Sequence, residues 1–415
     1  MKITGVIAEY NPFHNGHRYH LEQTRAISGA DYIIAVISGD FMQRGVPALI
    51  HKYARTEMAL QNGADLVLEL PAVYAAGSAE FFAMGAVSLL DRLGSVDSLC
   101  FGSECGSLKP LSRIASVLLK EPEEYRSALQ KELKKGHSFP KARSIALQNF
   151  LPGRPDDIDL TSPNNILGIE YIKALFKRNS PIIPLTLQRQ GSGYHESALN
   201  GSNDSMSFSS ASAIRDSIGS CSGLSGIRRH VPPSVFQLLQ ASYGKSFPVN
   251  SGDFSLMLKY RLLLEKENGF AHYQDVTTSL SDKIKKHLYD YENFEQFCSL
   301  LKSREITHSR ISRCLTHILL GITSEKTEKY TEKDYVFYAR ILGFRREAAP
   351  LFGILKANAS LPLISKLADA SPLLDETGLS MLEDDIRSAH IYDSVACHKF
   401  QASFINEYSR QLVIL

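Results

Sequence analysis

Two histidines three residues apart, His14 and His17, follow the first short apolar run of the chain. Gly16 lies between them, and a helix is predicted to begin near this point and to continue to about Ser28. Two imidazoles at a helix start can both face a phosphate group, because the helix N-terminus adds unpaired N–H groups and the positive end of its dipole. Gly16 lets the backbone approach such a group closely. As imidazolium ions or as N–H donors, the two side chains would stabilise charge developing on an α-phosphoryl group.

Two other interpretations of these histidines are open. They could be surface side chains at a helix cap, or, together with His20, ligands of a zinc ion. The spacing and the glycine fit a phosphate better than zinc. The sequence therefore predicts no metal site built from protein ligands alone.

The first half of the chain alternates apolar runs with helical patterns. The runs predict buried strands at residues 3–8, 32–37, 66–70, 96–101 and 182–187. The patterns between them predict helices at residues 16–28, 52–62, 78–93 and 164–177. Such alternation is typical of an α/β fold with a parallel sheet covered on both faces, which binds ligands beyond the carboxyl ends of its strands. Residues 9–17, 38–44 and 102–104 all follow predicted strands and so lie where a ligand should bind.

The second half has a different pattern. Residues 191–212 are rich in Gly and Ser and predict a loop, and beyond about residue 230 strand signals fade while Leu-rich helical periodicity dominates. Val231-Pro232-Pro233 marks the expected boundary. We therefore expect an α/β domain at residues 1–230 and a mainly α-helical domain at residues 231–415.

Composition narrows the class of protein. The chain has 415 residues, 44% hydrophobic and 22% charged, with a net charge of +2, so any nucleic-acid surface must be a local patch. Its six cysteines form no C-x-x-C pair, as expected of reduced thiols in a cytoplasmic protein. No apolar stretch approaches the roughly 20 residues of a membrane span. The sequence does not indicate an oligomeric state.

A second motif lies at residues 208–215, Phe-Ser-Ser-Ala-Ser-Ala-Ile-Arg. Ser209 or Ser210 can cap a helix, and Arg215 can reach a phosphate from it. Alone, the segment is better interpreted as an ordinary capped helix with a solvated arginine. Its combination with the paired histidines favours the phosphate-binding interpretation.

These two motifs resemble the H-x-G-H and I-S-S/T-x-x-I-R signatures of the nucleotidyltransferase superfamily, which is shared with class I aminoacyl-tRNA synthetases. The resemblance narrows when residues 9–20, 38–45, 101–104 and 162–168 are considered together. In this combination the whole chain is similar to the bacterial tRNA(Met) cytidine acetate ligase family.

The resemblance implies a Rossmann-like ATP-binding domain, activation of acetate as acetyl-adenylate with release of pyrophosphate, and transfer of the acetyl group to the wobble cytidine of elongator tRNA(Met), giving N4-acetylcytidine. Magnesium would arrive with ATP. Carried over to this chain, the ATP-binding residues are Ile7, Ala8, Glu9, Tyr10, Asn11, Pro12, Phe13, His14, Asn15, Gly16, His17, Arg18, Tyr19, His20, Gly102, Asn165, Arg189, Ser209, Ser210 and Arg215. Asn165 could instead be a helix-capping residue.

The acyl site is inferred from position. Residues 40–44 follow the second predicted strand and should face the same crevice as the histidines. Gln43 and Arg44 could hold the acetate carboxylate, and Asp40 could orient or deprotonate the attacking amine as a third catalytic residue. A turn with solvated charges is the alternative.

Two basic clusters are candidates for contacts with tRNA phosphates. Their members are Lys302, Arg304, Arg310 and Arg313, together with Lys131, Lys134, Lys135, Lys141 and Arg143. Arg310, Arg313 and His317 would share one helix face. A solvated helix face is the alternative interpretation.

Two rival functions share part of the pattern. A nucleotidyltransferase that makes a soluble cofactor or a lipid precursor would have both motifs, but it leaves about 185 residues of helical domain unexplained. An RNA-binding protein without catalytic activity is the second rival, and the intact motifs argue against it.

Overall fold

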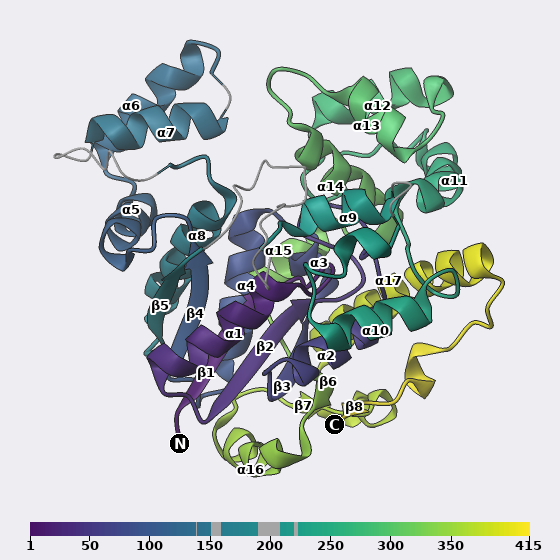
Figure 1. The fold of residues 1–415 in the computed structure, drawn as a ribbon. Coiled ribbons are helices and arrows are strands. Elements are labelled where there is room, and N and C mark those ends of the chain that lie inside the picture. The colour runs from purple at the N-terminus through teal and green to yellow at the C-terminus, as the bar shows by residue number, and fades with distance from the viewer. Residues whose placement is uncertain (138, 151–158, 190–207, 220–222) are drawn as a thin grey trace.

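The described residues fold around one eight-stranded sheet with the strand order β5-β4-β1-β2-β3-β6-β7, and β8 pairs with β6 (Figure 1). A computed structural model describes residues 1–137, 139–150, 159–189, 208–219 and 223–415. The strands are β1 (Ile3–Ala8), β2 (Tyr32–Ser38), β3 (Leu66–Leu70), β4 (Ser98–Ser103), β5 (Ile183–Gln188), β6 (Ala339–Phe344), β7 (Leu363–Ile364) and β8 (Val413–Ile414).

Strands β1 to β5 run parallel, as expected from the alternating pattern. Their register places Val6 of β1 beside Ala35 of β2 and Cys100 of β4. Successive residues of β2 face opposite cores, so that Ile33 packs with one hydrophobic cluster and Ile34 with the other. Both faces of the central strands are therefore buried.

Helices cover both faces of this sheet. One core contains residues of α1, α2, α9 and α10, and the other contains residues of α4, α5, α8 and α17. The helices are α1 (Asn15–Ser28), α2 (Lys52–Gln61), α3 (Ala72–Ala75), α4 (Ala79–Arg92), α5 (Leu108–Lys120), α6 (Glu123–Lys134), α7 (Phe139–Phe150), α8 (Pro163–Arg178), α9 (Ala211–Gly219), α10 (Pro233–Ser242), α11 (Ser255–Glu265), α12 (Thr278–His287), α13 (Phe294–Leu301), α14 (His308–Leu320), α15 (Ser324–Glu332), α16 (Ala349–Asn358) and α17 (Glu376–Phe400).

The second half contributes three strands to the same sheet, although its sequence pattern predicted helices alone. Strand β6 pairs antiparallel with β3 and parallel with β7 and β8. A charged residue, Arg340, interrupts the apolar run of β6 and hides its strand signal. Its guanidinium is buried against Glu69 at 3.0 Å and Glu407 at 2.7 Å. A division at residue 230 thus leaves part of the sheet in the second half, and the domain boundary stays a prediction.

The helical layer α11–α15 lies near the carboxyl end of the sheet (Figure 1). Helix α14 docks on the turn that follows β2, where the Gly45 carbonyl oxygen accepts hydrogen bonds from Ser312 Oγ and Thr316 Oγ1, each at 2.7 Å. Gly45 has φ +71°, and a Cβ there would lie 2.3 Å from Arg313 N. In the part of the chain that the structure describes, no helix is both long and apolar enough to cross a bilayer.

Candidate active site

A cavity of about 430 Å³ opens beyond the carboxyl ends of β1, β4 and β5. Most of the expected nucleotide-binding residues line it: Ile7, Ala8, Glu9, Tyr10, Asn11, His14, Gly16, His17, Tyr19, His20, Gly102, Arg189, Ser209, Ser210 and Arg215. Gln43 and Arg44 also line it, so the structure brings the expected acyl site and the histidines to one crevice.

Five expected residues do not line the cavity: Pro12, Phe13, Asn15, Arg18 and Asn165. Phe13 is buried in the core, and Asn15 donates to the Arg229 carbonyl oxygen at 2.8 Å. Arg18 pairs with Glu22 on the outer face of α1. Phe13 and Asn15 therefore anchor the histidine turn to the core and to the segment before α10.

The two histidines use one ring nitrogen each to build the start of α1. His14 Nδ1 accepts a hydrogen bond from Gly16 N at 3.0 Å, and His17 Nδ1 accepts one from His14 N at 3.3 Å. Their rings stack with centroids 3.7 Å apart. A neutral imidazole whose Nδ1 is an acceptor carries its proton on Nε2. Both side chains therefore have an Nε2–H donor available to a ligand in the cavity.

Electrostatics supports the same protonation state. Burial, with a contribution from Arg189 and Arg215, lowers the pKa of His14 to about 3. Burial and the neighbouring His14 hold the pKa of His17 well below its usual range. Of the two possibilities that the sequence left open, the structure supports neutral N–H donors rather than imidazolium ions.

The second motif closes the other side of the cavity. Ser210 Oγ accepts from Ala213 N at 3.1 Å and so caps α9, as its sequence predicts. Arg215 donates to the Asn11 carbonyl oxygen at 2.7 Å, which ties α9 to the histidine turn. Ser209 Oγ lies 2.9 Å from His230 Nδ1. The two motifs, nearly 200 residues apart in sequence, thus form one wall rich in hydrogen-bond donors.

Gly102 and Arg189 lie together at the ends of β4 and β5. A Cβ on Gly102 would lie 3.3 Å from Arg189 Cγ, so a larger residue there would crowd the arginine. Asn165 is buried, and its Oδ1 accepts from Glu104 N and Cys105 N at 3.0 and 3.1 Å. Its amide joins the end of β4 to α8 and does not reach the cavity. Asn165 is the third residue of α8, whose N-cap position is Ser162, so it is not the helix-capping residue of the alternative interpretation, and its contact with ATP stays a prediction.

Asp40 also lies away from the cavity. Its carboxylate is fully buried, and Oδ1 accepts from Lys52 N at 2.9 Å. Oδ2 lies 3.8 Å from Lys52 Nζ and 3.9 Å from His51 Nε2. In the turn after β2, Gln43 and Arg44 face the crevice, whereas Asp40 is buried beneath the turn. The expected role of Asp40 beside the attacking amine therefore has no geometric support, and we assign it a structural role.

The arginine that holds the crevice together was not predicted. Arg55 on α2 is fully buried and donates to the carbonyl oxygens of Glu9 at 2.8 Å and Ser38 at 2.9 Å. It also bonds to the carbonyl oxygens of Gly39 and Ile50. One side chain thus fixes the chain where both β1 and β2 end. Its sequence context, an ordinary amphipathic helix, gives no signal of this.

The HIGH Nucleotidyl Transferase family model matches residues 1–407 of the chain. A tRNA(Met) cytidine acetate ligase of a Thermoanaerobacter species is 43% identical over 393 residues, with 94% of this chain and 95% of that protein covered. A tRNA(Met) cytidine acetate ligase of Clostridium acetobutylicum is 39% identical over 422 residues, with both chains fully covered. The chain belongs to the tRNA(Met) cytidine acetate ligase family of HIGH nucleotidyl transferases.

Solved structures of the same family agree over the full length. The chain superposes on Thermotoga maritima TmcAL in its apo form with a TM-score of 0.93 and on the form bound with alpha-thio ATP with a TM-score of 0.90. Sequence identity is 32% in both cases, and each comparison covers 100% of both chains. The resemblance stated from the motifs is therefore confirmed.

The residues expected to contact tRNA differ in their availability. Lys131, Lys134, Lys141, Lys302 and Arg304 are exposed. Lys135 pairs with Glu132 at 2.5 Å, and Arg143 pairs with Glu170 at 3.2 Å. The cluster at residues 131–143 is on α6 and α7, and Lys302 and Arg304 follow α13 directly. Figure 1 shows α6–α7 and α12–α13 beyond the carboxyl end of the sheet, on opposite sides.

The side of α14 that bears Arg313 and His317 is not the solvated face of the alternative interpretation, and its contact with tRNA stays a prediction. Lys302 and Arg304 lie before the helix begins, and Arg313 lines the cavity while its Nε lies 3.6 Å from Asp275. His317 is buried between the carbonyl oxygens of Gln274 and Ala76, at 2.8 and 2.9 Å. The docking of α14 on Gly45 turns this face inward.

Apolar side chains that were not predicted as site residues complete the cavity: Ala79, Phe82, Phe101, Ile166, Leu167, Tyr171, Leu187 and Phe208. Phe101 precedes Gly102 and Ile166 follows Asn165. Their positions at strand and helix ends could have identified them as cavity residues from the sequence. Phe82 and Tyr171 lie within helices and look in sequence like any buried residue.

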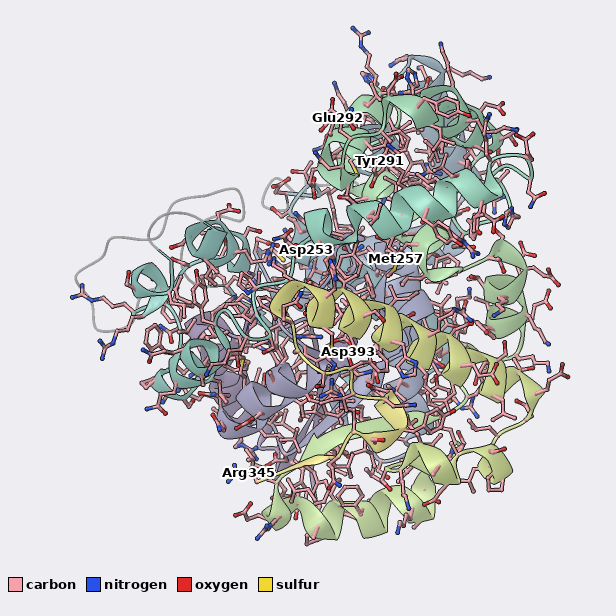
Figure 2. The ribbon with its side chains drawn as sticks, turned by 90° about the vertical axis from the view of Figure 1, so that its right-hand side faces the viewer. Asp253, Met257, Tyr291, Glu292, Arg345 and Asp393 are labelled. Carbon is pink, nitrogen blue, oxygen red and sulfur yellow. The ribbon has the colours of Figure 1, made fainter. Side chains whose placement is uncertain are left out.

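One cluster among the described residues has the geometry of a metal site. Ligand atoms of His51, Asp393 and Glu407 lie within 4.8 Å of one another. Figure 2 places Asp393 on α17, which crosses the body of the molecule. Asp393 pairs with Arg410 at 2.9 Å, and Glu407 pairs with Lys52 at 2.6 Å. Side-chain cations of the protein already neutralise these carboxylates, so the cluster is an ion-pair network.

Proposed function

We propose that this protein is an ATP-dependent acetate ligase that forms acetyl-adenylate and transfers the acetyl group to the wobble cytidine of elongator tRNA(Met), giving N4-acetylcytidine. The observation that carries this proposal is the stacked pair His14 and His17, whose Nε2–H donors are left for a ligand in the cavity. Membership of the acetate ligase family supports the choice of acid and acceptor.

In the first step a carboxylate oxygen of acetate attacks the α-phosphorus of ATP, and pyrophosphate leaves. His14 and His17 donate to the α-phosphoryl oxygens as negative charge develops on them, while Arg189 and Arg215 offer cationic donors at the edge of the cavity. These groups position and stabilise the transition state, so no protein nucleophile is needed.

A magnesium ion bound with ATP would neutralise part of the triphosphate charge. Among the described residues lining the cavity, Glu9 is the only carboxylate, and one of its oxygens already accepts from Gln43 N. The residues present therefore fit an ion held mainly by phosphate oxygens and water rather than by a protein cage.

The acetate carboxylate would lie beside Gln43 and Arg44. Both residues belong to the turn that ends β2, and both line the cavity on the side where α14 contributes Ser309 and Arg313. An amide and a guanidinium together match the hydrogen-bonding needs of a carboxylate.

For tRNA, we propose that exposed Lys302 and Arg304 on one side and exposed Lys131, Lys134 and Lys141 on the other contact phosphates. The ion-paired Lys135 and Arg143 and the partly buried Arg310 would contribute less. The wobble base lies in a single-stranded loop, so it can enter the cavity without opening a duplex.

The proposal is tested by exchange of labelled pyrophosphate into ATP. Exchange that requires acetate is the expected result, because adenylation is reversible before acetyl transfer. Exchange without acetate, or formation of a dinucleotide-type product from another substrate, would favour a nucleotidyltransferase that makes a soluble product.

A further inference from the structure

Glu9 lines the cavity among the expected ATP-binding residues, but its carboxylate has no part in the adenylation step described above. It is the first residue after β1, and it is the one carboxylate among the described residues that line the cavity. Its Oε1 accepts a hydrogen bond from Gln43 N at 2.7 Å. Glu9 therefore joins the strand that leads to the histidines with the turn that carries the proposed acetate site.

The backbone of Glu9 is held as firmly as its side chain. Its carbonyl oxygen accepts from Arg55 Nη1 at 2.8 Å, and the same arginine binds the end of β2. A carboxylate has two oxygens with about four lone-pair sites, so the bond from Gln43 leaves acceptor capacity for a second partner. A rigid acceptor beside the acyl site suits a group that must receive a proton there.

Acetyl transfer to a cytidine requires such an acceptor. The exocyclic N4 amine attacks the carbonyl carbon of acetyl-adenylate, the new N–C bond forms, and the C–O bond to AMP breaks. AMP leaves with that electron pair, and N4 must lose one of its two protons. The Nδ1 atoms of His14 and His17 cannot take the proton, because they already accept backbone N–H groups. Asp40 is buried away from the cavity.

We propose that Glu9 is a catalytic residue of the transfer step, which accepts the proton from the attacking amine. The inference rests on the proposed function, because it names a residue for the second half of the same reaction. Glu9 takes the role that the sequence first suggested for Asp40.

Two substitutions separate this role from a structural one. In Glu9→Gln, the amide oxygen can still accept from Gln43 N, but the side chain can no longer take a proton. In Glu9→Asp, the carboxylate is kept on a shorter stem, which weakens the bond to Gln43 N. A matched control is Glu22→Gln, which changes an exposed carboxylate on α1 that pairs only with Arg18 among the described contacts.

The experiment measures two rates for each purified protein: acetate-dependent pyrophosphate exchange, and single-turnover transfer of labelled acetyl to tRNA. In Glu9→Gln the rate of transfer should fall about 10²–10⁴-fold further than the rate of exchange, the range of general base catalysis, while the change in exchange itself measures any effect on the neighbouring ATP and acetate sites. Glu9→Asp should transfer faster than Glu9→Gln, and Glu22→Gln should match the wild type in both rates.

Three results would overturn the inference. Transfer by Glu9→Gln at the wild-type rate would remove the proton-accepting role. Glu9 would be structural if Glu9→Gln lost exchange and transfer equally, through misfolding or otherwise, and if Glu9→Asp transferred more slowly than Glu9→Gln. Loss of exchange that added magnesium restores would make it a metal ligand. A wild-type protein without acetate-dependent exchange would instead contradict the proposed function itself.

Discussion

His14 and His17 stack with ring centroids 3.7 Å apart, and each accepts a backbone N–H at Nδ1. One nitrogen of each ring therefore shapes the helix start, and the other is left for chemistry. The division allows a substitution that removes only one of the two functions.

Replacing His17 with Asn tests the role of its Nε2–H donor in catalysis. The Asn side-chain oxygen can take the place of Nδ1 as acceptor for His14 N, whereas the Nε2–H donor is lost. Acetate-dependent pyrophosphate exchange should fall about 10²–10³-fold, as for loss of one donor to a developing oxyanion. The control His287→Asn, at the far end of α12, should leave exchange unchanged. Undiminished exchange in His17→Asn would contradict the role assigned to this nitrogen.

The buried His14 predicts a loss of stability in acid. Burial lowers its pKa to about 3, while in the unfolded chain it titrates near 6.5. Between these values the unfolded state binds more protons, so the contribution is complete above about pH 6.5 and is lost as pH falls toward 3. The loss should approach about 1.4 kcal/mol per pH unit.

Urea unfolding of the wild type and His14→Asn at pH 7.5, 6.0 and 5.0 measures this contribution. The variant should show a shallower fall in unfolding free energy over this range, because its residue 14 does not titrate. Identical slopes would mean that folding does not lower the pKa of His14.

Replacing the buried Arg55 should lower the free energy of unfolding far more than replacing an exposed arginine. Arg55→Met leaves the carbonyl oxygens of Glu9, Ser38 and Gly39 buried without this donor, and we expect a loss of about 3–5 kcal/mol in unfolding free energy. Arg18→Met, which breaks an exposed pair with Glu22, should cost less than about 1 kcal/mol. Comparable losses in denaturant titrations of the two variants would refute the assignment.

Gly45 tests the docking of α14. Gly45→Ala places an alanine in a left-handed backbone conformation, φ +71°, which costs free energy. It also places a Cβ 2.3 Å from Arg313 N, so α14 must shift. Gly244 has the same φ, with nothing within 4 Å of its would-be Cβ. Gly244→Ala should cost only the left-handed conformation, about 1–2 kcal/mol, and Gly45→Ala clearly more. Equal unfolding free energies would show that α14 is not held at this turn.

The double variant Lys302→Ala/Arg304→Ala tests the tRNA surface. Its KM for tRNA should rise and the salt dependence of tRNA binding should weaken, with pyrophosphate exchange unchanged. The control is Lys356→Ala/Lys366→Ala. These lysines are exposed near α16, which Figure 1 places at the opposite end of the sheet. A similar effect of both pairs on tRNA binding would indicate nonspecific electrostatics.

Local patterns were enough to predict strands β1 to β5, the start of α1 and the cap of α9, because each depends on residues close in sequence. Contacts between distant segments were not predictable in the same way. The burial of Asp40 depends on Lys52 and on the packing of α2, and the strand nature of β6 depends on carboxylates that neutralise Arg340. The inward turn of Arg313 depends on Gly45, more than 250 residues earlier.

The central claim is tested most directly by incubating the purified protein with ATP, labelled acetate and bacterial tRNA, and then analysing the nucleosides. We predict labelled N4-acetylcytidine in elongator tRNA(Met), dependent on ATP and lost in His17→Asn. Acetate-dependent pyrophosphate exchange without labelled cytidine would contradict the proposed acceptor. Absence of both, from folded protein that binds ATP, would contradict the enzymatic account as a whole.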